Sequence, residues 1–220
     1  VLFENKKKTV TDKSVLPFLI SDKLLDELGG SIEVGDILFT KGKLRAFDLY
    51  SEEQKRKTKN LRIVCSKIEK VDDYTRTRNK LEVYGHLKNK LFKVKFDEDG
   101  KVMRDEKNRV VPEYDENGEL IPWTRKNNEG FRVNDVAIQV SKEVEEDGEV
   151  KVKYQDIIPA IAYGAPAWQI AKEIPVGTKV KTRGYVRCRE KNGYPGEFVY
   201  EYVINRITPV DEEETGENKE

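Results

Sequence analysis

The chain is poor in the residues from which catalytic and metal centres are usually built. Its 220 residues include one histidine, two cysteines and one methionine. The histidine, His86, has no cysteine or carboxylate at ligand spacing, so we expect a structural role for it. The sequence shows no glycine-rich phosphate loop, nucleophile elbow or paired-cysteine zinc pattern. We therefore expect a protein that is not an enzyme and that uses no metal or cofactor.

Long apolar runs and a disulfide framework are also lacking. No apolar stretch approaches the ~20 residues that a membrane-spanning helix needs. Cys65 and Cys188 have no spacing typical of a metal site or a disulfide framework, which favours a reducing, cytoplasmic location. Hydrophobic and charged residues each make up 37% of the chain, so we expect thin cores, small domains and a heavily charged surface.

The charge that is present is unevenly distributed. The formal net charge is zero, but residues 211–220 hold six carboxylates against one lysine, a net of −5, which leaves +5 on residues 1–210. A mildly basic body with an acidic tail favours a polyanionic partner. A solubilising tail on an ordinary surface explains the same numbers equally well. We expect the tail to be disordered, because its carboxylates lack the apolar neighbours that could offset the entropy of ordering.

One stretch of the sequence occurs twice at a constant offset. The corresponding pairs, each 142 residues apart, are Pro17 and Pro159, Val34 and Val176, Gly35 and Gly177, Gly42 and Gly184, and Arg45 and Arg187. The final strands of the two copies match at an offset of 139, so the hairpin before them is three residues longer in the first copy. An offset that holds through a strand, a link and a second strand indicates one structural unit present twice.

The repeat divides the chain into two domains. The predicted regions are a first domain (1–71), a linker (72–78), a second domain (79–210) with an insertion at about 92–130, and an acidic tail (211–220). The second copy has a full strand upstream of the point where the first copy begins, so we expect the first domain to lack its N-terminal strand. Turn signals at Asp99-Gly100 and Asn117-Gly118 predict that the insertion forms projecting β-hairpins.

Each copy is predicted to consist of strands interrupted by one short helix. In the first copy we expect Asp22 to cap the helix, and in the second Pro166 suits the first helical position. Gly42 and Gly184 lie inside long predicted strands, where a glycine indicates a bulge. Five strands with a helix between the third and fourth is the order of the OB-fold, a small partly open barrel that binds single-stranded nucleic acid or sugars. The predicted fold class is all-β with short helices, as two tandem OB-fold barrels.

Several segments of residues 79–210 resemble the bacterial-type single-stranded DNA-binding protein family. They are Asn79–Leu87, Asp135–Val140, Ile161–Gly164, Val176–Val180, Gly184–Arg187 and Tyr202–Ile207. Through the internal repeat the resemblance extends, more weakly, to residues 1–71, as in family members with two OB units on one chain. It implies sequence-tolerant binding of single-stranded DNA, or RNA, in replication, recombination or repair. It also implies replication or recombination proteins as partners and, by analogy, four OB units in a homodimer.

The sequence departs from the family pattern in two respects. Family members stack bases on several aromatic residues, but here Tyr163 alone clearly occupies such a position. Ser21 stands at the matching place in the first copy, and Lys191 stands where an aromatic residue is usual. The acidic tail also lacks the short apolar tip with which family members recruit replication enzymes. These departures point to a specialised relative, such as one encoded by a phage or mobile element.

Single-strand binding requires cations along the phosphates and aromatic rings under the bases. The candidates in the second domain are Tyr163, Arg183, Tyr185, Arg187, Arg189, Lys191 and Tyr194. The candidates in the first domain are Lys43, Arg45, Lys55, Arg56, Lys57, Lys59 and Arg62. Equal parity places Arg183, Arg187 and Arg189 on one side of a strand, unless a bulge at Gly184 intervenes. For the aromatic residues core packing is the alternative, and we favour it for Phe47 and Trp168.

Two functions from different classes are compatible with the sequence. Basic hairpins and tandem barrels favour a single-stranded nucleic-acid-binding protein. The scarcity of aromatic residues and the zero net charge favour an OB-fold module that binds a protein partner, as a structural component or an inhibitor. In that second case we expect the insertion at 92–130 to provide the contact surface.

Overall fold

The computed structural model of the chain describes residues 16–51, 55–72, 79–146, 149–191 and 194–210. Their elements, in chain order, are β1 (Phe18–Leu19), α1 (Asp22–Glu27), β2 (Leu38–Ser51), β3 (Arg56–Lys70), β4 (Leu81–Asn89), β5 (Arg125–Lys126), β6 (Arg132–Glu146), β7 (Glu149–Tyr163), α2 (Ala165–Lys172), β8 (Lys179–Lys191) and β9 (Tyr194–Pro209). Neither of these two helices is long and apolar enough to cross a membrane. The acidic tail, most of the predicted linker and the strand end expected at the first residues lie outside the described residues.

The second unit is a five-stranded barrel. Its strands follow the order β4-β8-β9-β7-β6, and pairing between β4 and β6 closes the ring, while β5 adds to the free edge of β6. Neighbouring strands are antiparallel except β7 and β9, which are parallel. Helix α2 follows the third barrel strand and buries Ala167, Ile170 and Ala171 against the core. This order is the one that the sequence predicted for an OB-fold.

The sheet of the first unit repeats part of this barrel residue by residue. Its order, β1-β3-β2, corresponds to β7-β9-β8. Phe18 pairs with Ile63 in parallel, and Ala160 pairs with Tyr202 in the same way. These partners differ by 142 and 139 residues, which are the two offsets of the sequence repeat. The repeat in the sequence is therefore also a repeat in strand register.

A glycine bulge lies at the same point in both long hairpins. The register shifts just before Gly42 in the first unit and just before Gly184 in the second, as the sequence predicted. A Cβ atom on Gly42 would lie 2.4 Å from the carbonyl oxygen of Val64, and one on Gly184 would lie 1.8 Å from that of Val203. Neither position can accept a side chain unless the backbone of the partner strand moves.

The two short helices start where local chemistry sets their first turns. Helix α1 is capped by Ser21, whose Oγ accepts a hydrogen bond of 3.4 Å from the backbone N–H of Leu24. The expectation that Asp22 is the cap was wrong by one residue, since Asp22 is the first helical residue and its charge suits the first turn. Helix α2 has Pro166 in its first turn, as predicted.

The two units share one hydrophobic core. Leu44, Ala46 and Leu61 of the first unit belong to the same buried cluster as the barrel residues. Beside this cluster the guanidinium of Arg45 on β2 forms an ion pair with Asp156 of β7, whose side chain is 9% exposed. The same guanidinium lies 4.1 Å from the centre of the Tyr154 ring. Apolar burial and a partly buried ion pair therefore hold the units together, in addition to the chain connection.

The insertion consists of four turns of one construction. The residues that open the turns are Asp97, Asp105, Asp115 and Asn127, and each side-chain Oδ1 accepts a hydrogen bond from the backbone N–H four residues later. The residues in the left-handed conformation are Gly100, Asn108, Gly118 and Gly130, with φ of 76°, 59°, 79° and 82°. The two predicted hairpins are present, and sequence reasoning missed the turns that contain Asn108 and Gly130.

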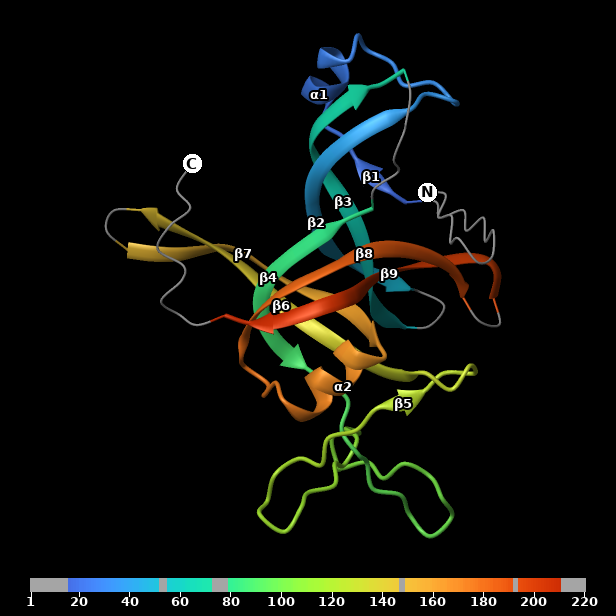
Figure 1. Cartoon of the computed structure of the whole chain (residues 1–220), viewed down its shortest axis with the longest axis vertical. Coiled ribbons are helices and arrows are strands. Elements are labelled where there is room, and N and C mark those ends of the chain that lie inside the picture. Colours follow the sequence, from blue (N-terminus) through green and yellow to red (C-terminus); the bar gives the residue numbers. More distant parts are fainter. Residues whose placement is uncertain (1–15, 52–54, 73–78, 147–148, 192–193, 211–220) are drawn as a thin grey trace.

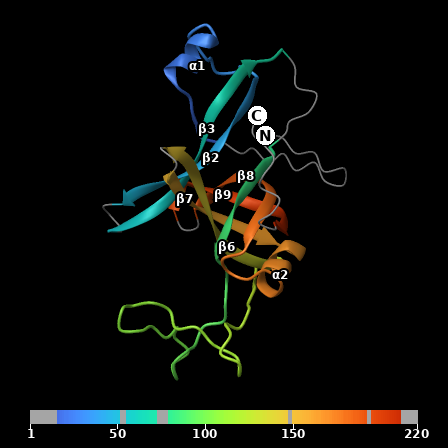
Figure 2. The ribbon, with the colours of Figure 1, turned by 90° about the vertical axis from the view of Figure 1, so that its left-hand side faces the viewer.

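Backbone hydrogen bonds tie the hairpins of the insertion to one another in closed rings. Lys95 donates to Val111, Val111 donates to Met103, and Met103 donates back to Lys95, over 2.9–3.0 Å. A second ring of the same kind joins residues 93, 113 and 121. Each of the three segments thus satisfies its neighbour's backbone, and the insertion holds its shape with few buried side chains. It projects from the barrel at the end opposite to α1 (Figures 1 and 2).

Polar side chains fix the root of the insertion to the barrel. The Nζ atom of Lys90 donates to the carbonyls of Ile170, Ala171 and Ile174 over 2.8–3.1 Å, at the end of α2. Buried Asn134 accepts a hydrogen bond of 2.9 Å from the backbone N–H of Leu91. The first residues of the insertion are therefore anchored to both α2 and β6.

Candidate nucleic-acid interface

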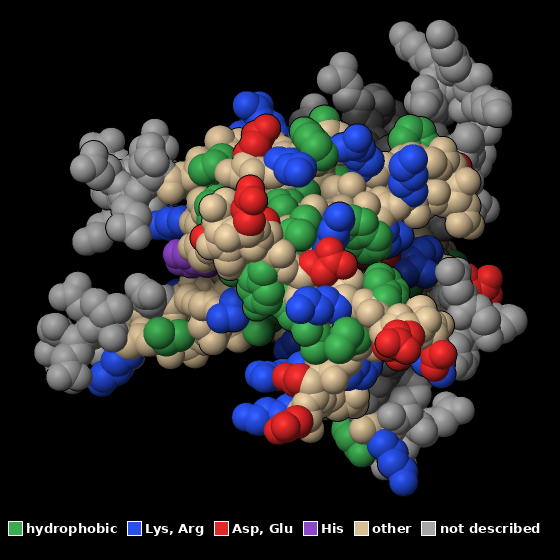
Figure 3. Space-filling model, turned by 90° about the horizontal axis from the view of Figure 1, so that it is seen from below, with side chains coloured by type: hydrophobic (Ala, Val, Ile, Leu, Met, Phe, Trp, Pro, Cys, Tyr) green, Lys and Arg blue, Asp and Glu red, His purple; other side chains and the backbone are tan. Residues whose placement is uncertain are grey.

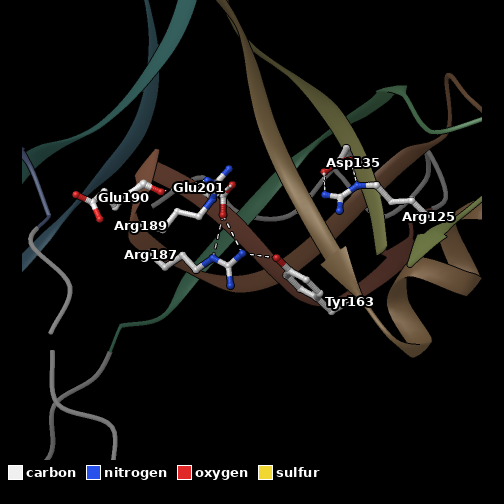
Figure 4. A network of polar contacts seen from close by, with 7 residues as sticks. All are labelled: Arg125, Asp135, Tyr163, Arg187, Arg189, Glu190 and Glu201. Atoms are coloured by element: carbon white, nitrogen blue, oxygen red, sulfur yellow. Dashed lines mark hydrogen bonds and ion pairs between the residues drawn. The ribbon is translucent and has the colours of Figure 1, made fainter. Parts of the chain in front are cut away.

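Tyr163 and three arginines lie in one polar network on the outer face of the barrel (Figure 4). Arg187 on β8 donates a hydrogen bond from Nη2 to the hydroxyl of Tyr163, and its guanidinium carbon lies 5.0 Å from the centre of the tyrosine ring. Arg187 also donates from Nε to Glu201 on β9 over 2.9 Å, and Arg189 donates from Nε to the other carboxylate oxygen over 2.7 Å. One carboxylate therefore orients two arginines, and one of these orients the aromatic ring.

The alternation of β8 explains why these side chains share a face. Val180, Thr182, Gly184 and Val186 are buried, so the odd-numbered residues point outward. Arg187 lies directly opposite Glu201 in the β8–β9 register, which makes the ion pair a cross-strand pair. The shift at Gly184 skips Asn205 on β9 and leaves the parity of β8 intact. The prediction that Arg183, Arg187 and Arg189 share one side of the strand is therefore confirmed.

The structure nevertheless separates Arg183 from the other two arginines. Its Nε atom lies 2.8 Å from Glu82 of β4, on the opposite side of β8 from Glu201. Burial alone would raise the pKa of Glu82, but the charges of Arg183, Lys181 and Lys80 outweigh it and lower that pKa. Arg183 belongs to this second ion-pair cluster and not to the network around Tyr163.

Arg125 is a member of the network that the sequence did not indicate. It lies on β5, at the return of the insertion, and binds Asp135 of β6 through two hydrogen bonds of 2.6 and 2.9 Å. The hydrogen bond to Asp135 raises the pKa of Arg125. For Arg187, burial opposes the charge, but the bonds to Glu201 and Tyr163 outweigh burial and the pKa is raised. Both guanidinium groups therefore stay positively charged.

Carboxylates match the positive charge of this face almost completely. The network contains the cations Arg125, Arg187 and Arg189 and the anions Asp135, Glu190 and Glu201 (Figure 4). A shallow pocket of ≈ 310 Å³ lies beside it, and its lining includes Asp135, Ile161 and Glu201. A phosphate that binds here has to compete with carboxylates for the arginines.

Tyrosine rings on this face also cover apolar residues. Tyr163 and Tyr185 pack against a small cluster of the buried residues Val133, Ile161 and Val203. Tyr163 is half-buried, so one part of its ring contributes to packing and another part is accessible. Tyr185 has the same double character, which agrees with the weighing of core packing against base stacking in the sequence.

The first-unit candidates do not gather into an equivalent site. Arg45 pairs with Asp156 at the contact between the units, and Lys59 pairs with Asp48 over 2.6 Å. Arg62 is half-buried directly opposite Arg45, whereas Lys43 and Lys55 are exposed. Four candidates have strand backbones but side chains outside the described residues, namely Arg56, Lys57, Lys191 and Tyr194.

The expectation of core packing is wrong for Trp168. Its side chain is 43% exposed, because α2 buries the face that carries Ala167, Ile170 and Ala171, and Trp168 falls outside that face. Phe47 is half-buried. Among the residues that the structure describes, no group of three or more histidine, cysteine or acidic side chains is placed to hold a metal ion.

Comparison with known proteins supports the fold. No family model matches the chain, and no curated protein matches it. The solved structure of wild-type single-stranded DNA-binding protein from Thermus aquaticus matches 86% of this chain with a TM-score of 0.53 and 14% identity. A deletion mutant of that protein matches 82% with a TM-score of 0.49. The protein PriB from Ralstonia solanacearum matches 60% with a TM-score of 0.35.

Fold and comparison together define the class of this protein as tandem OB-fold. The match to the Thermus aquaticus protein extends over both units, so the predicted resemblance to bacterial single-stranded DNA-binding proteins is confirmed at the level of fold. This chain covers 66% of the length of the wild-type Thermus aquaticus chain and 63% of the deletion mutant.

Proposed function

We propose that the protein binds single-stranded DNA with little sequence preference through the face that carries Tyr163. The supporting observation is the stacked pair of Tyr163 and Arg187, with a guanidinium 5.0 Å from the ring centre, on an OB barrel. An aromatic face beside an arginine suits any base above and any phosphate beside it, which makes binding tolerant of sequence. The Thermus aquaticus protein of the same fold is a single-stranded DNA-binding protein.

The carboxylates of this face make the proposed binding a process of exchange. Arg189 is 43% exposed and Arg187 29% exposed, and both bind the same carboxylate. Ion pairs at such exposed positions contribute about 0–1 kcal/mol, so a phosphate can replace Glu201 at small cost. We expect moderate affinity at low salt and a steep loss of affinity as salt rises.

The biological role that we propose follows from the resemblance. It is the protection and handling of single strands in replication, recombination or repair, in the cytoplasm of a bacterial or phage-infected cell. The working assembly in this proposal is a homodimer, which presents four OB units. Replication or recombination proteins are the proposed further partners.

Replacing Tyr163 with alanine tests the proposed face. The change should weaken binding of a fluorescent oligothymidine by about 1–3 kcal/mol, the contribution of one stacked base, with little change in salt dependence. Fluorescence anisotropy at a fixed low salt concentration measures the affinity. Tyr114→Ala is the matched control, because Tyr114 is 55% exposed on the insertion and far along the chain from the network. Equal affinities for Tyr163→Ala and the parent would place the binding face elsewhere.

A second candidate function is favoured by the surface of the insertion. Four large apolar side chains there are 43–57% exposed, namely Phe96, Tyr114, Trp123 and Phe131. Seen from this end of the molecule, apolar and charged side chains are interspersed over the surface (Figure 3). Such a mixed surface on a firmly anchored projection suits a protein partner. If the parent shows no salt-sensitive binding of single strands, this protein-binding function becomes the better proposal.

A further inference from the structure

An exposed tryptophan lies outside the network around Tyr163. Trp168 projects from α2 with 43% of its side chain exposed. The guanidinium carbon of Arg132 on β6 lies 4.4 Å from the centre of its ring, and the Nζ atom of Lys172 lies 5.3 Å from the same centre. Two cations therefore hold one large aromatic side chain at the surface.

The positive charge around Trp168 is not matched by carboxylates. Among the described residues, neither Arg132 nor Lys172 forms an ion pair, in contrast to Arg187 and Arg189. Exposed Lys126 on β5 lies directly opposite exposed Arg132 in the strand register. Like charges in directly opposite positions repel each other, and an anion between them relieves that repulsion. This part of the surface thus combines an aromatic ring with cations that lack a protein partner.

Backbone hydrogen bonds place this tryptophan next to the end of β7, where Tyr163 is the last residue. The N–H of Trp168 donates to the carbonyl of Gly164 over 3.1 Å, and the N–H of Gly164 donates to the carbonyl of Arg132 over 2.8 Å. Gly164 has a φ of 64°, which lets the chain turn directly from the strand into the helix. One helical turn therefore separates the two aromatic residues along the chain.

We propose that Trp168, together with Arg132 and Lys172, forms a second base-stacking contact that extends the path of a single strand beyond Tyr163. The inference rests on the proposed function. OB-folds bind about 4–16 nucleotides, so a strand that stacks on Tyr163 reaches past this residue. The tryptophan ring stacks on a base without reading its edge, and the two cations contact the flanking phosphates. Because these cations have no carboxylate to displace, this contact binds phosphate more readily than the network does.

The two tryptophans of the chain provide a direct optical test. In a Trp123→Phe variant the indole fluorescence reports on Trp168 alone. Titration with oligothymidines of increasing length should quench this fluorescence, and the quenching should saturate together with the anisotropy of a labelled strand. Oligothymidines that bind the parent in a salt-dependent way, yet leave the fluorescence unchanged, would overturn the second contact and leave the proposed function intact.

Affinity measurements on variants complete the test. Trp168→Ala should weaken binding of long oligothymidines at least fivefold, while Trp168→Phe retains most of the affinity because it keeps an aromatic ring. Arg132→Gln should lower the slope of log K against log salt by about one phosphate contact. Trp123→Ala is the matched control, since Trp123 is also 43% exposed. If Trp168→Ala binds like this control, the inference is wrong. A parent without any salt-dependent binding would instead overturn the proposed function itself.

Discussion

At the scale of single residues, the arginines on the outer face of β8 have two competing kinds of partner. Glu201 already binds Arg187 and Arg189, and its side chain is 17% exposed. A phosphate offers the same bidentate geometry and is itself charged. The carboxylate therefore keeps the arginines oriented when nucleic acid is absent and lowers the affinity when nucleic acid binds.

Replacing Glu201 with glutamine should tighten single-strand binding. The change keeps the shape of the side chain but removes the competing charge, so affinity at low salt should rise by about 1 kcal/mol, or roughly fivefold. Anisotropy titration measures this change, and circular dichroism verifies the fold. Glu190→Gln, on the same hairpin, serves as a comparison because Glu190 does not bridge the two arginines. Weaker binding by Glu201→Gln would show that the carboxylate contributes to the bound state and does not compete with it.

At the scale of elements, the two glycine bulges show which features a sequence pattern can predict. The offset of 142 residues predicted that Gly42 and Gly184 are equivalent, and both bulges occur with the same register. Side-chain exposure was harder to predict, because α2 has eight residues and the face that carries Trp168 depends on how the helix docks. The pairing of Arg187 with Glu201 was missed for a similar reason, since it depends on the exact β8–β9 register.

Gly184→Ala should destabilise the protein by about 2–3 kcal/mol, the cost of forcing atoms into a packed site. The added Cβ would lie 1.8 Å from the carbonyl oxygen of Val203, and a backbone atom paired in a central hairpin cannot move without breaking the ladder. Urea denaturation measures the free energy of unfolding. Ser141→Ala, at an exposed position on β6, controls for the effect of alanine in a strand. A free energy of unfolding equal to that of the control would contradict the close approach.

At the scale of the whole molecule, the shared core links the stability of the two units. Leu44, Ala46 and Leu61 become buried by contact with the barrel, so the first sheet depends on the second unit for its apolar face. The division of the chain at residues 71 and 79 remains a prediction about sequence organisation. In energetic terms, the structure joins the two units through this core and through Arg45 and Asp156.

Arg45→Ala should lower the stability of both units together. Removing Arg45 leaves Asp156 buried without a partner, and we expect a loss of about 2 kcal/mol, less than for a fully buried pair because Arg45 is 30% exposed. Calorimetry should show one unfolding transition for the parent and one, at lower temperature, for the variant. Lys43→Ala is the control, as Lys43 is exposed at the same parity on β2. Two separate transitions in the parent would contradict the shared core.

The salt dependence of single-strand affinity tests the central claim most directly. The affinity of the parent protein for an oligothymidine should be measured by anisotropy over a series of salt concentrations. We predict a linear fall of log K with log salt, with a slope of about −0.7 for each phosphate that the protein contacts, and a smaller slope for Arg187→Gln. An affinity that does not change with salt, or the absence of binding at low salt, would contradict the assignment of this face to nucleic acid.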